Sequence, residues 1–456
     1  MRKQDEFLVE AEKFAFNREH RNRMQLNVHS YESAFVHAKK QFANLELARD
    51  RAAYFKWKVT ENLDKYLIEF ESNVIRKGGK VLWADDAKGA LAEIEMVLNK
   101  LNTQLVVKSQ STITNEIGLN TFLRAKGIDV VETSVGEYIN DVANEQPYHT
   151  VTPAMHKTKL EITQLLNDKI STSIDADPQE IIADIDAALR GKINKANVAI
   201  TGANFLIADS GMVAIAENDG SARLCTSVPQ ALIIVGGIEK VIPSINDVDL
   251  FFSLFSTYSS GQKLSTYNSI IGPKPATEVD GPKEFYVVLV DNGRSNILAQ
   301  HDQREALGCI SCGACSNVCP VFQNIGGHAY GGSNKGPIGA VWAQHQFGID
   351  EFKHLSYASP ICGKCTEVCP VKINIHNHLL HNRKDVVHQG HVKNGEKLIW
   401  YSWKKFMLSR KNLNKSSSIK AFMLKQFFKT EWGERREFPK LADKSFNQLW
   451  RERFGQ

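Results

Sequence analysis

The sequence predicts an α/β protein, in which a layered central domain is followed by a small cysteine-rich domain and both ends are helical. Three observations predict this arrangement. Short apolar runs alternate with amphipathic stretches between residues 80 and 298, as in folds where strands alternate with helices. Seven of the eight cysteines gather between Cys309 and Cys369. The two ends are rich in helix-forming residues.

These patterns divide the 456 residues into four expected domains. Residues 1–75 form a helical segment, because Tyr31–Glu69 has recurrent apolar positions and neither Gly nor Pro. Residues 76–298 form the α/β domain, 299–380 the cysteine-rich domain, and 381–456 a basic helical region.

Within the α/β domain, apolar runs bounded by turn residues mark the expected strands. They are 80–83, 104–108, 127–132, 197–201, 205–208, 212–217, 221–227, 231–236 and 285–290. The expected helices are 85–101, 116–126, 178–190 and 245–255. Because Asn218-Asp219-Gly220 is typical of a hairpin turn, we expect a mixed sheet rather than a purely parallel one.

Composition bears on location and partners. The charged start and the absence of a long apolar run predict a cytoplasmic protein without a secretory signal or membrane span. Residues 391–456 hold 16 Lys/Arg against 6 Asp/Glu, and Trp400, Tyr401, Trp403 and Phe406 lie in the same region. Such a region could contact an acidic partner protein or the inner face of a membrane peripherally, or form a solvated surface. No nucleic-acid-binding motif accompanies the charge, so no nucleic-acid partner is expected.

The first cysteine cluster, Cys309-x2-Cys312-x2-Cys315-x3-Cys319-Pro320, has the spacing of bacterial ferredoxins. Three thiolates from such a loop bind one 4Fe-4S cluster, and the fourth cysteine binds the other cluster. Gly313 and Ala314 are small, so the loop backbone can approach the cluster and donate N–H groups to its sulfur atoms.

The second cluster, Ser359-x2-Cys362-x2-Cys365-x3-Cys369-Pro370, matches the first except for Ser359. Exchange of the fourth cysteines predicts one 4Fe-4S cluster on Cys309, Cys312, Cys315 and Cys369, which we call cluster 1. Cluster 2 would be held by Cys319, Cys362 and Cys365. Its fourth ligand could be Ser359, Cys225, water, a partner's side chain, or nothing.

The alternative is a pair of structural zinc sites, which favour separated C-x2-C pairs and fit this spacing poorly. The eighth cysteine, Cys225, lies in an expected strand and is interpreted as a buried core thiol.

Other polar groups have weaker signals. His376, His378 and His381 could bind a metal, but a solvated helix face is the preferred interpretation. Glu217 precedes a turn and could act as a nucleophile or base. Two further candidates for anion binding are the glycines at Gly202-Ala-Asn204 and Gly211 and the strand-to-helix junction Lys108–Glu116; turns and ordinary capping explain them as well.

With these residues assembled, the chain resembles the iron–sulfur subunit of the lactate-utilisation protein B family. The resemblance rests on the two cysteine motifs, including Ser359, on Lys108-Ser-Gln-Ser111 and on Ile200–Gly211 followed by Glu217-Asn-Asp-Gly220. It also rests on Gly236-Gly-Ile-Glu239-Lys240. It implies a LUD domain similar to the NagB/RpiA/CoA-transferase group, in which Glu217 lies where CoA transferases keep a glutamate.

The resemblance also implies a function and partners: oxidation of L-lactate to pyruvate together with a CCG-type cysteine-rich subunit and a small LUD-domain subunit. We expect this chain to be the electron-transfer subunit, with an unknown electron acceptor. The catalytic centre could lie on a partner, since no flavin or NAD motif is visible. The alternatives are a LUD-type ligand-binding or transferase enzyme with structural clusters, and a regulatory scaffold.

Overall fold

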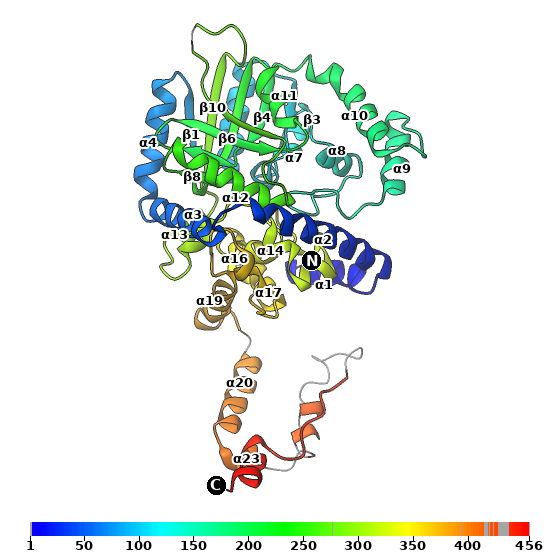
Figure 1. The fold of residues 1–456 in the computed structure, drawn as a ribbon, viewed down its shortest axis with the longest axis vertical. Helices are drawn as coiled ribbons and strands as arrows, with labels where there is room; N and C mark the ends of the chain where they lie inside the picture. Colours follow the sequence, from blue (N-terminus) through cyan, green and yellow to red (C-terminus); the bar gives the residue numbers. More distant parts are fainter. Residues whose placement is uncertain are drawn as a thin grey trace. The chain divides into compact units, whose positions relative to one another are not determined.

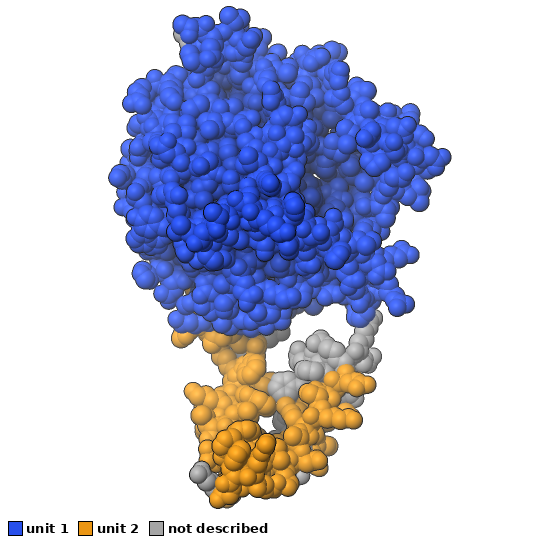
Figure 2. All heavy atoms as spheres, viewed as in Figure 1, with its two compact units in different colours: residues 1–385 blue, residues 386–456 orange. Residues whose placement is uncertain are grey.

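The computed structural model describes residues 2–275, 277–392, 394–414, 418, 420–422, 424–426 and 437–455. Residues 1–385 form one compact unit and residues 386–456 a second (Figure 2). The further division of the first unit at residues 75 and 298 stays a prediction. Parts of the basic region, at 415–417, 419, 423 and 427–436, lie outside the described residues.

A six-stranded parallel sheet forms the centre of the α/β region (Figure 1), with the strand order β1-β10-β7-β4-β2-β3. The strands are β1 (Lys80–Ala84), β2 (Leu105–Lys108), β3 (Asp129–Glu132), β4 (Val198–Gly202), β7 (Ala231–Gly237) and β10 (Glu284–Val290). All six coincide with expected strands. β7 is buried along its whole length, which explains its continuous apolar sequence, since parallel strands are covered on both faces.

Helices cover both faces of this sheet. One face packs against α4 (Leu63–Arg76), α8 (Val135–Val142), α9 (Lys159–Ile170), α10 (Pro178–Ile193) and α11 (Ser221–Ser227). The other packs against α5 (Ala87–Lys100), α6 (Thr112–Glu116) and α7 (Leu119–Ala125). Neighbouring residues of one strand serve opposite faces, as Val106 and Val107 do. Sequence explains the helix starts: in α10, Asp177 caps the helix and Pro178 opens it.

A second sheet, in the order β8-β5-β6-β9, replaces the single mixed sheet that was expected. Its strands are β5 (Phe205–Ile207), β6 (Met212–Glu217), β8 (Val241–Ile242) and β9 (Tyr267–Ile271), and β5 pairs with β6 antiparallel and with β8 parallel. The expected strand 221–227 was wrong, because these residues form α11. Gly220 has φ +76° before the helix, so the Asn218–Gly220 turn leads into a helix and not into a hairpin partner.

The remaining elements of the first unit surround the cysteines and the second sheet. They are α1 (Lys3–Ala15), α2 (Arg18–Ala38), α3 (Leu45–Thr60), α12 (Val248–Ser260), α13 (Arg294–Leu298), α14 (Ala314–Asn317), α15 (Pro320–Ile325), α16 (Gly336–Phe347), α17 (Ile349–Ala358), α18 (Lys364–Val368) and α19 (Ile375–His388), with the short 3-10 helices η1 (Lys39–Gln41), η2 (Ile238–Lys240), η3 (Ile245–Asp247), η4 (Arg304–Gly308) and η5 (His328–Tyr330). The cysteine-rich region shares one apolar core with β5, β6 and α12. It is therefore packed onto the α/β region and not tethered to it loosely.

The second unit contains α20 (Asn394–Met407), α21 (Arg410–Leu413) and α23 (Phe446–Phe454). Over the described residues, no helix combines the length and apolar character that crossing a bilayer requires.

Candidate iron–sulfur centres and the adjoining cavity

The two cysteine motifs fold into the same local structure. In the first, Gly313 has φ +74° and precedes α14, which carries Cys315. In the second, Gly363 has φ +83° and precedes α18, which carries Cys365. In each motif the chain reverses its direction at a glycine, which follows Cys312 in the first motif and Cys362 in the second. Residues other than glycine rarely adopt this positive φ.

The four cysteines predicted for cluster 1 are brought together. Cys309, Cys312 and Cys315 line one cavity with Cys369, which comes from the second motif. Burial, with a smaller contribution from Cys309, raises the pKa of Cys369 to about 12. These thiols would therefore stay protonated near neutral pH unless a bound metal compensated their charge, as coordinated metal ions do.

Backbone N–H groups point at the sulfur atoms of this group. The N–H of Ser311 donates to Cys309 Sγ at 3.3 Å, and that of Ile373 donates to Cys369 Sγ at 3.4 Å. The pKa of Cys315 is raised by burial and lowered in part by the N–H of Ile338, in the first turn of α16. Such amides stabilise negative charge on cluster ligands, so the donor set fits a 4Fe-4S cluster.

Cys319, Cys362 and Cys365 form the second group. Burial raises the pKa of Cys365 to about 11, with contributions from Cys319 and Cys362, so the three thiols are close in space. Cys319 and Cys365 are buried, whereas Cys362 is exposed. Cluster 2 would therefore lie nearer the surface than cluster 1.

Ser359 occupies the position in its loop that Cys309 occupies in the first. The N–H of Ile361 donates to Ser359 Oγ at 3.2 Å, as that of Ser311 donates to Cys309 Sγ. Both donors have positive φ, +55° and +57°. Cys225 lies elsewhere: it is fully buried in α11, as expected of a core thiol but not in a strand, with its Sγ 3.5 Å from Thr133 Oγ1.

The spacing of the thiols bears on the zinc alternative. Sulfur ligands on a tetrahedral zinc lie about 3.8 Å apart, given Zn–S bonds of about 2.3 Å. Among the residues that the structure describes, no three cysteine sulfurs lie within 4.8 Å of one another.

A group that sequence reasoning missed does lie within that distance, namely Glu145, His156 and His328. His156 Nε2 lies 2.7 Å from Glu145 Oε2, and Glu145 Oε1 accepts a hydrogen bond from Lys157 Nζ. Burial lowers the pKa of His156 to about 4, so its ring is neutral and donates to Glu145. Hydrogen bonds account for the closeness of these three side chains. They come from separate parts of the sequence and form no motif that could have predicted the group.

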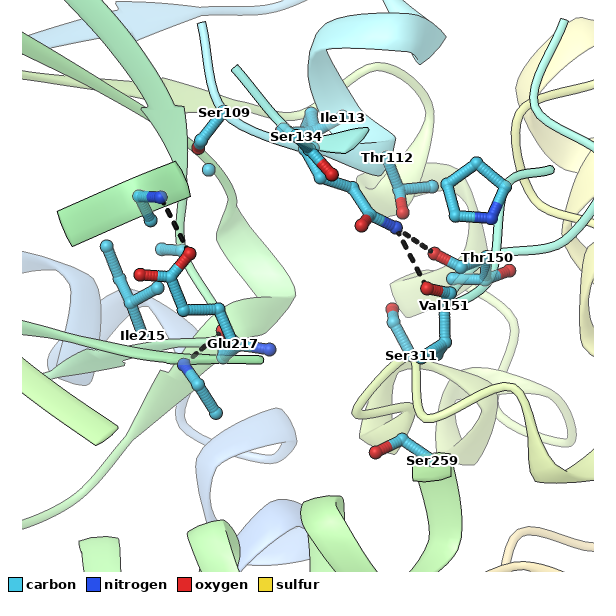
Figure 3. Close-up of a pocket in the computed structure, with 18 of the residues that line it drawn as sticks. Ser109, Thr112, Ile113, Ser134, Thr150, Val151, Ile215, Glu217, Ser259 and Ser311 are labelled. Carbon is cyan, nitrogen blue, oxygen red and sulfur yellow. Dashed lines mark hydrogen bonds between the residues drawn. The ribbon is translucent and has the colours of Figure 1, made fainter. Parts of the chain in front are cut away.

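The α/β region contains a cavity of about 480 Å³, here called the LUD cavity (Figure 3). It lies at the carboxyl ends of the parallel strands, where ligands bind in open α/β sheets. Its wall includes residues that follow or end strands of the central sheet: Ser109, Ser134, Gly202 and Gly237. Many lining side chains are hydroxyls, and apolar ones include Ile215, Phe255 and Trp342.

Glu217 faces this cavity from the end of β6, across from Thr150 and Ser311 (Figure 3). Its carboxylate accepts hydrogen bonds from the N–H groups of Ala222 (2.6 Å) and Arg223 (2.8 Å) at the start of α11. Burial raises the pKa of Glu217, and these donors oppose the rise. The carboxylate is thus held in place in the cavity wall; a nucleophilic role stays a hypothesis.

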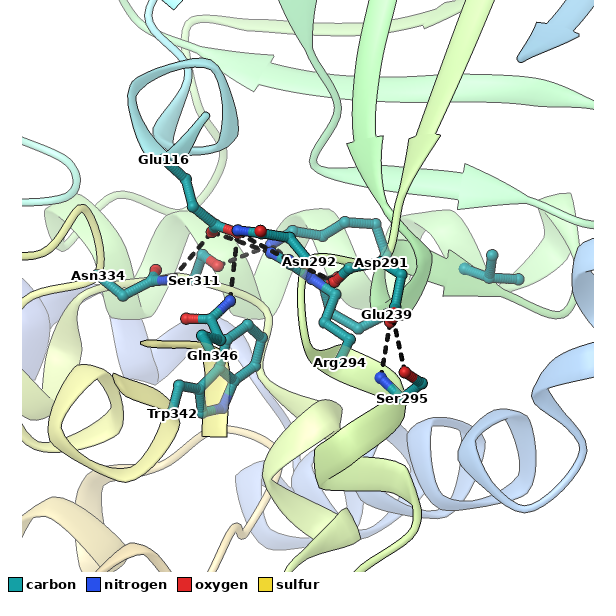
Figure 4. Close-up of polar contacts among 12 residues, drawn as sticks. Glu116, Glu239, Asp291, Asn292, Arg294, Ser295, Ser311, Asn334, Trp342 and Gln346 are labelled. Carbon is teal, nitrogen blue, oxygen red and sulfur yellow. Dashed lines mark hydrogen bonds and ion pairs between the residues drawn. The ribbon is translucent and has the colours of Figure 1, made fainter. Parts of the chain in front are cut away.

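A buried polar network links the α/β region to the cysteine-rich region (Figure 4). Arg294 donates to both oxygens of Glu116, at 2.8 and 3.1 Å, and also to Glu239. Burial opposes the charge of Glu239, but Arg294 lowers its pKa below the ordinary value. Gln346 also donates to Glu116, at 3.2 Å, and the guanidinium lies 5.3 Å from the Trp342 ring.

The LUD cavity and the cysteine-lined cavity share a wall. Thr150, Ser311 and Asn334 line both, and Ser311 lies between Cys309 and Cys312 in sequence. Lys240 Nζ donates to Ser311 Oγ at 2.6 Å. A ligand in the LUD cavity would therefore be separated from cluster 1 by about one layer of side chains.

The other candidates have structural roles. His378 is buried and lies 3.1 Å from Glu305, so the expectation of a solvated histidine face was wrong for this residue. His376 bonds to Thr366 and His381 lies 3.9 Å from Asp302. At the Lys108–Glu116 junction, Lys108 forms a fully buried ion pair with Glu132 at 2.9 Å, and Ser111 caps α6.

Comparisons with known proteins match most of this chain. The LUD domain family model matches residues 67–290, and the 4Fe-4S dicluster domain model matches residues 305–373. Lactate utilization protein B of Bacillus licheniformis is 39% identical over 366 residues, covering 80% of this chain and 76% of that protein. The chain belongs to the lactate utilization protein B family. 

Other members of the family are similarly related. Lactate utilization protein B of Bacillus subtilis is 41% identical, and the match covers 80% of this chain and 76% of that protein. The Bacillus cytotoxicus protein is 37% identical, and the match covers 91% of this chain and 90% of that protein. A solved structure of a DUF162 family protein from Deinococcus radiodurans is 13% identical, with a TM-score of 0.29; it covers 50% of this chain and 98% of that chain.

Proposed function

We propose that this chain is the electron-transfer iron–sulfur subunit of a multi-subunit system that oxidises L-lactate to pyruvate in the cytoplasm. The names of its relatives support a role in lactate utilization. The observation that carries the electron-transfer role is the cavity shared by Cys309, Cys312, Cys315 and Cys369, which come from two distant loops. The CCG-type cysteine-rich subunit and the small LUD-domain subunit are the proposed partners.

In this proposal the cysteines hold two 4Fe-4S clusters, each of which exchanges one electron at a time. Lactate oxidation releases two electrons, so two neighbouring centres match its stoichiometry. The chain's own contribution is to bury cluster 1, donate N–H groups to its thiolates and leave Cys362 at the surface near cluster 2. Ser359 is the proposed fourth ligand of cluster 2, because its Oγ has the same position in the second loop as Cys309 Sγ has in the first.

Anaerobic purification tests the cofactor content. Iron and sulfide analysis should give about eight irons per chain for two complete clusters, and about seven if cluster 2 has lost one. Cys312→Ala should lose cluster 1, whereas Cys225→Ala, a change of a buried thiol outside both groups, should keep both. A colourless protein that binds zinc would contradict the proposal.

Electron paramagnetic resonance tests the electron transfer. With the partner subunits and L-lactate, the clusters should become reduced, and without lactate they should not. Clusters whose oxidation state never responds while lactate is consumed would favour the alternative, a LUD-type ligand-binding or transferase enzyme with structural clusters. That alternative has one supporting observation, the position of Glu217 in the cavity wall. It predicts that Glu217→Gln abolishes lactate consumption and leaves the oxidation state of the clusters as it is in the unchanged protein.

A further inference from the structure

The LUD cavity adjoins the cavity that the four cysteines of the cluster-1 group line. Thr150, Ser311 and Asn334 line both cavities, and Cys309, Cys312, Cys315 and Cys369 line the second one. Cys362, in the cluster-2 group, is exposed, whereas the four cysteines of the cluster-1 group line the cavity next to the LUD cavity. This arrangement gives cluster 2 access to a partner protein and gives cluster 1 access to whatever occupies the cavity.

The size of the cavity indicates the class of occupant. Cavities of about 300–1,000 Å³ hold ligands of drug or cofactor size, and this one measures about 480 Å³. A three-carbon acid would leave most of that space empty. Ile113, Ile215, Phe255 and Trp342 supply apolar surface for a flat ring, and the hydroxyls of Ser259 and Thr150 also line the cavity (Figure 3).

The charge at the shared wall indicates the chemistry. Lys240 lines the cavity and donates to Ser311, the residue between two cluster-1 cysteines. Its ammonium is 3.9 Å from Glu239, which is itself bonded to Arg294. A cation held at this boundary stabilises negative charge that appears on a ligand when an electron arrives from cluster 1.

We propose that the LUD cavity binds a ring-conjugated organic two-electron carrier, of the flavin or quinone class, which exchanges electrons with cluster 1 beside Lys240. This inference rests on the proposed function and names its electron acceptor. Lactate loses two electrons and two protons to become pyruvate. The electrons pass singly through the clusters to the carrier, and two protons from water that reaches the cavity complete its dihydro form.

Binding of two probes to the anaerobic, oxidised holoprotein tests the site. Flavin mononucleotide is followed by its own fluorescence and menadione by calorimetry, and saturable binding of either one supports the inference and identifies the ring class. Lys240→Met and Ser259→Trp, which fills part of the cavity, should each weaken binding at least tenfold. Lys263→Met, an exposed lysine after α12, is the matched control and should bind normally.

Electron transfer is then measured by mixing the reduced holoprotein with the bound probe and following cluster reoxidation. The rate should saturate with probe concentration and fall at least tenfold in Ser259→Trp at unchanged iron content. Binding of neither probe, or binding unaffected by both variants, would overturn the inference. Clusters that lactate fails to reduce would contradict the proposed function instead, and probe binding to the oxidised protein would still be measurable.

Discussion

At the scale of single residues, two glycines with the same backbone conformation have different surroundings. A Cβ on Gly313 would lie 2.8 Å from His149 Cε1, whereas a Cβ on Gly363 would meet nothing within 4 Å. Both have positive φ, so an alanine at either position carries a strain of about 1–2 kcal/mol. Only at Gly313 does a collision with a buried ring add to this strain.

We therefore expect Gly313→Ala to displace the loop that carries Cys312 and Cys315 and to lose most of the iron of cluster 1. Gly363→Ala should retain its iron and lose only a little stability. Iron and sulfide counts per chain on the two anaerobically purified variants make the comparison. Equal iron loss in both would mean that the backbone conformation, and not the contact with His149, is decisive.

Arg294 is the second residue whose surroundings predict a large effect. It is buried and is the cation that bonds to both Glu116 and Glu239. Removing one partner of a buried ion pair costs about 3–5 kcal/mol, because the remaining charge is left unpaired. We expect Arg294→Met to lower the free energy of unfolding by about this amount in denaturant titration.

The control for Arg294 is Arg190→Met. Arg190 forms an exposed ion pair with Asp186, and exposed pairs contribute only about 0–1 kcal/mol. If both variants unfold at the same denaturant concentration, then Arg294 is not required to balance the Glu116 and Glu239 carboxylates.

At the scale of elements, the success of sequence-based prediction follows burial. The inner strands of the parallel sheet were predicted because they are buried and apolar, as β7 is along its whole length. β8 has two residues, and β9 alternates between exposed and half-buried positions, so neither produces a distinct apolar run. Residues 221–227 were misassigned because Leu224, Cys225 and Thr226 suit a strand, whereas the helix depends on Glu217 bonding to its first N–H groups.

The candidate site was predictable in part for a similar reason. Local spacing predicts which cysteines act together, because each loop supplies three neighbouring ligands. The LUD cavity and its wall were not predictable, since they require Thr150, Lys240 and Ser311 to meet from distant segments. Ser359 was predictable in part. Its place in the motif follows from the sequence, but the hydrogen bond that it accepts from the N–H of Ile361 does not.

The equivalence of the two loops predicts how changes at Ser359 affect cluster 2. Ser359→Cys would supply a thiolate where the first loop has Cys309, and thiolates are the usual ligands of 4Fe-4S clusters. It should slow the loss of iron to a chelator several-fold, whereas Ser359→Ala should accelerate it. Ser227→Ala, on α11, is the control. Iron release at the same rate from all four proteins would show that position 359 does not contact cluster 2.

At the scale of the whole molecule, the parts that carry the proposed chemistry all belong to the first compact unit. The parallel sheet, the LUD cavity and both cysteine groups lie within residues 1–385. Residues 391–456 of the second unit hold 16 of the chain's 56 Lys and Arg residues. In α20 the side chains of Leu398, Trp400 and Tyr401 are exposed. Exposed aromatic and basic side chains on one helix are typical of contact with an anionic membrane surface.

We therefore expect removal of residues 391–456 to separate binding to membranes from cluster chemistry. Because its cavities and cores lie before residue 386, the shortened chain should keep its iron content and unfolding midpoint. It should also lose most of its sedimentation with vesicles that contain phosphatidylglycerol. Full-length protein should bind these vesicles less at high salt, since exposed charges are screened within about 3 Å at 1 M ionic strength. Equal sedimentation of both chains would contradict the membrane role, and loss of iron on truncation would show that the second unit stabilises the first.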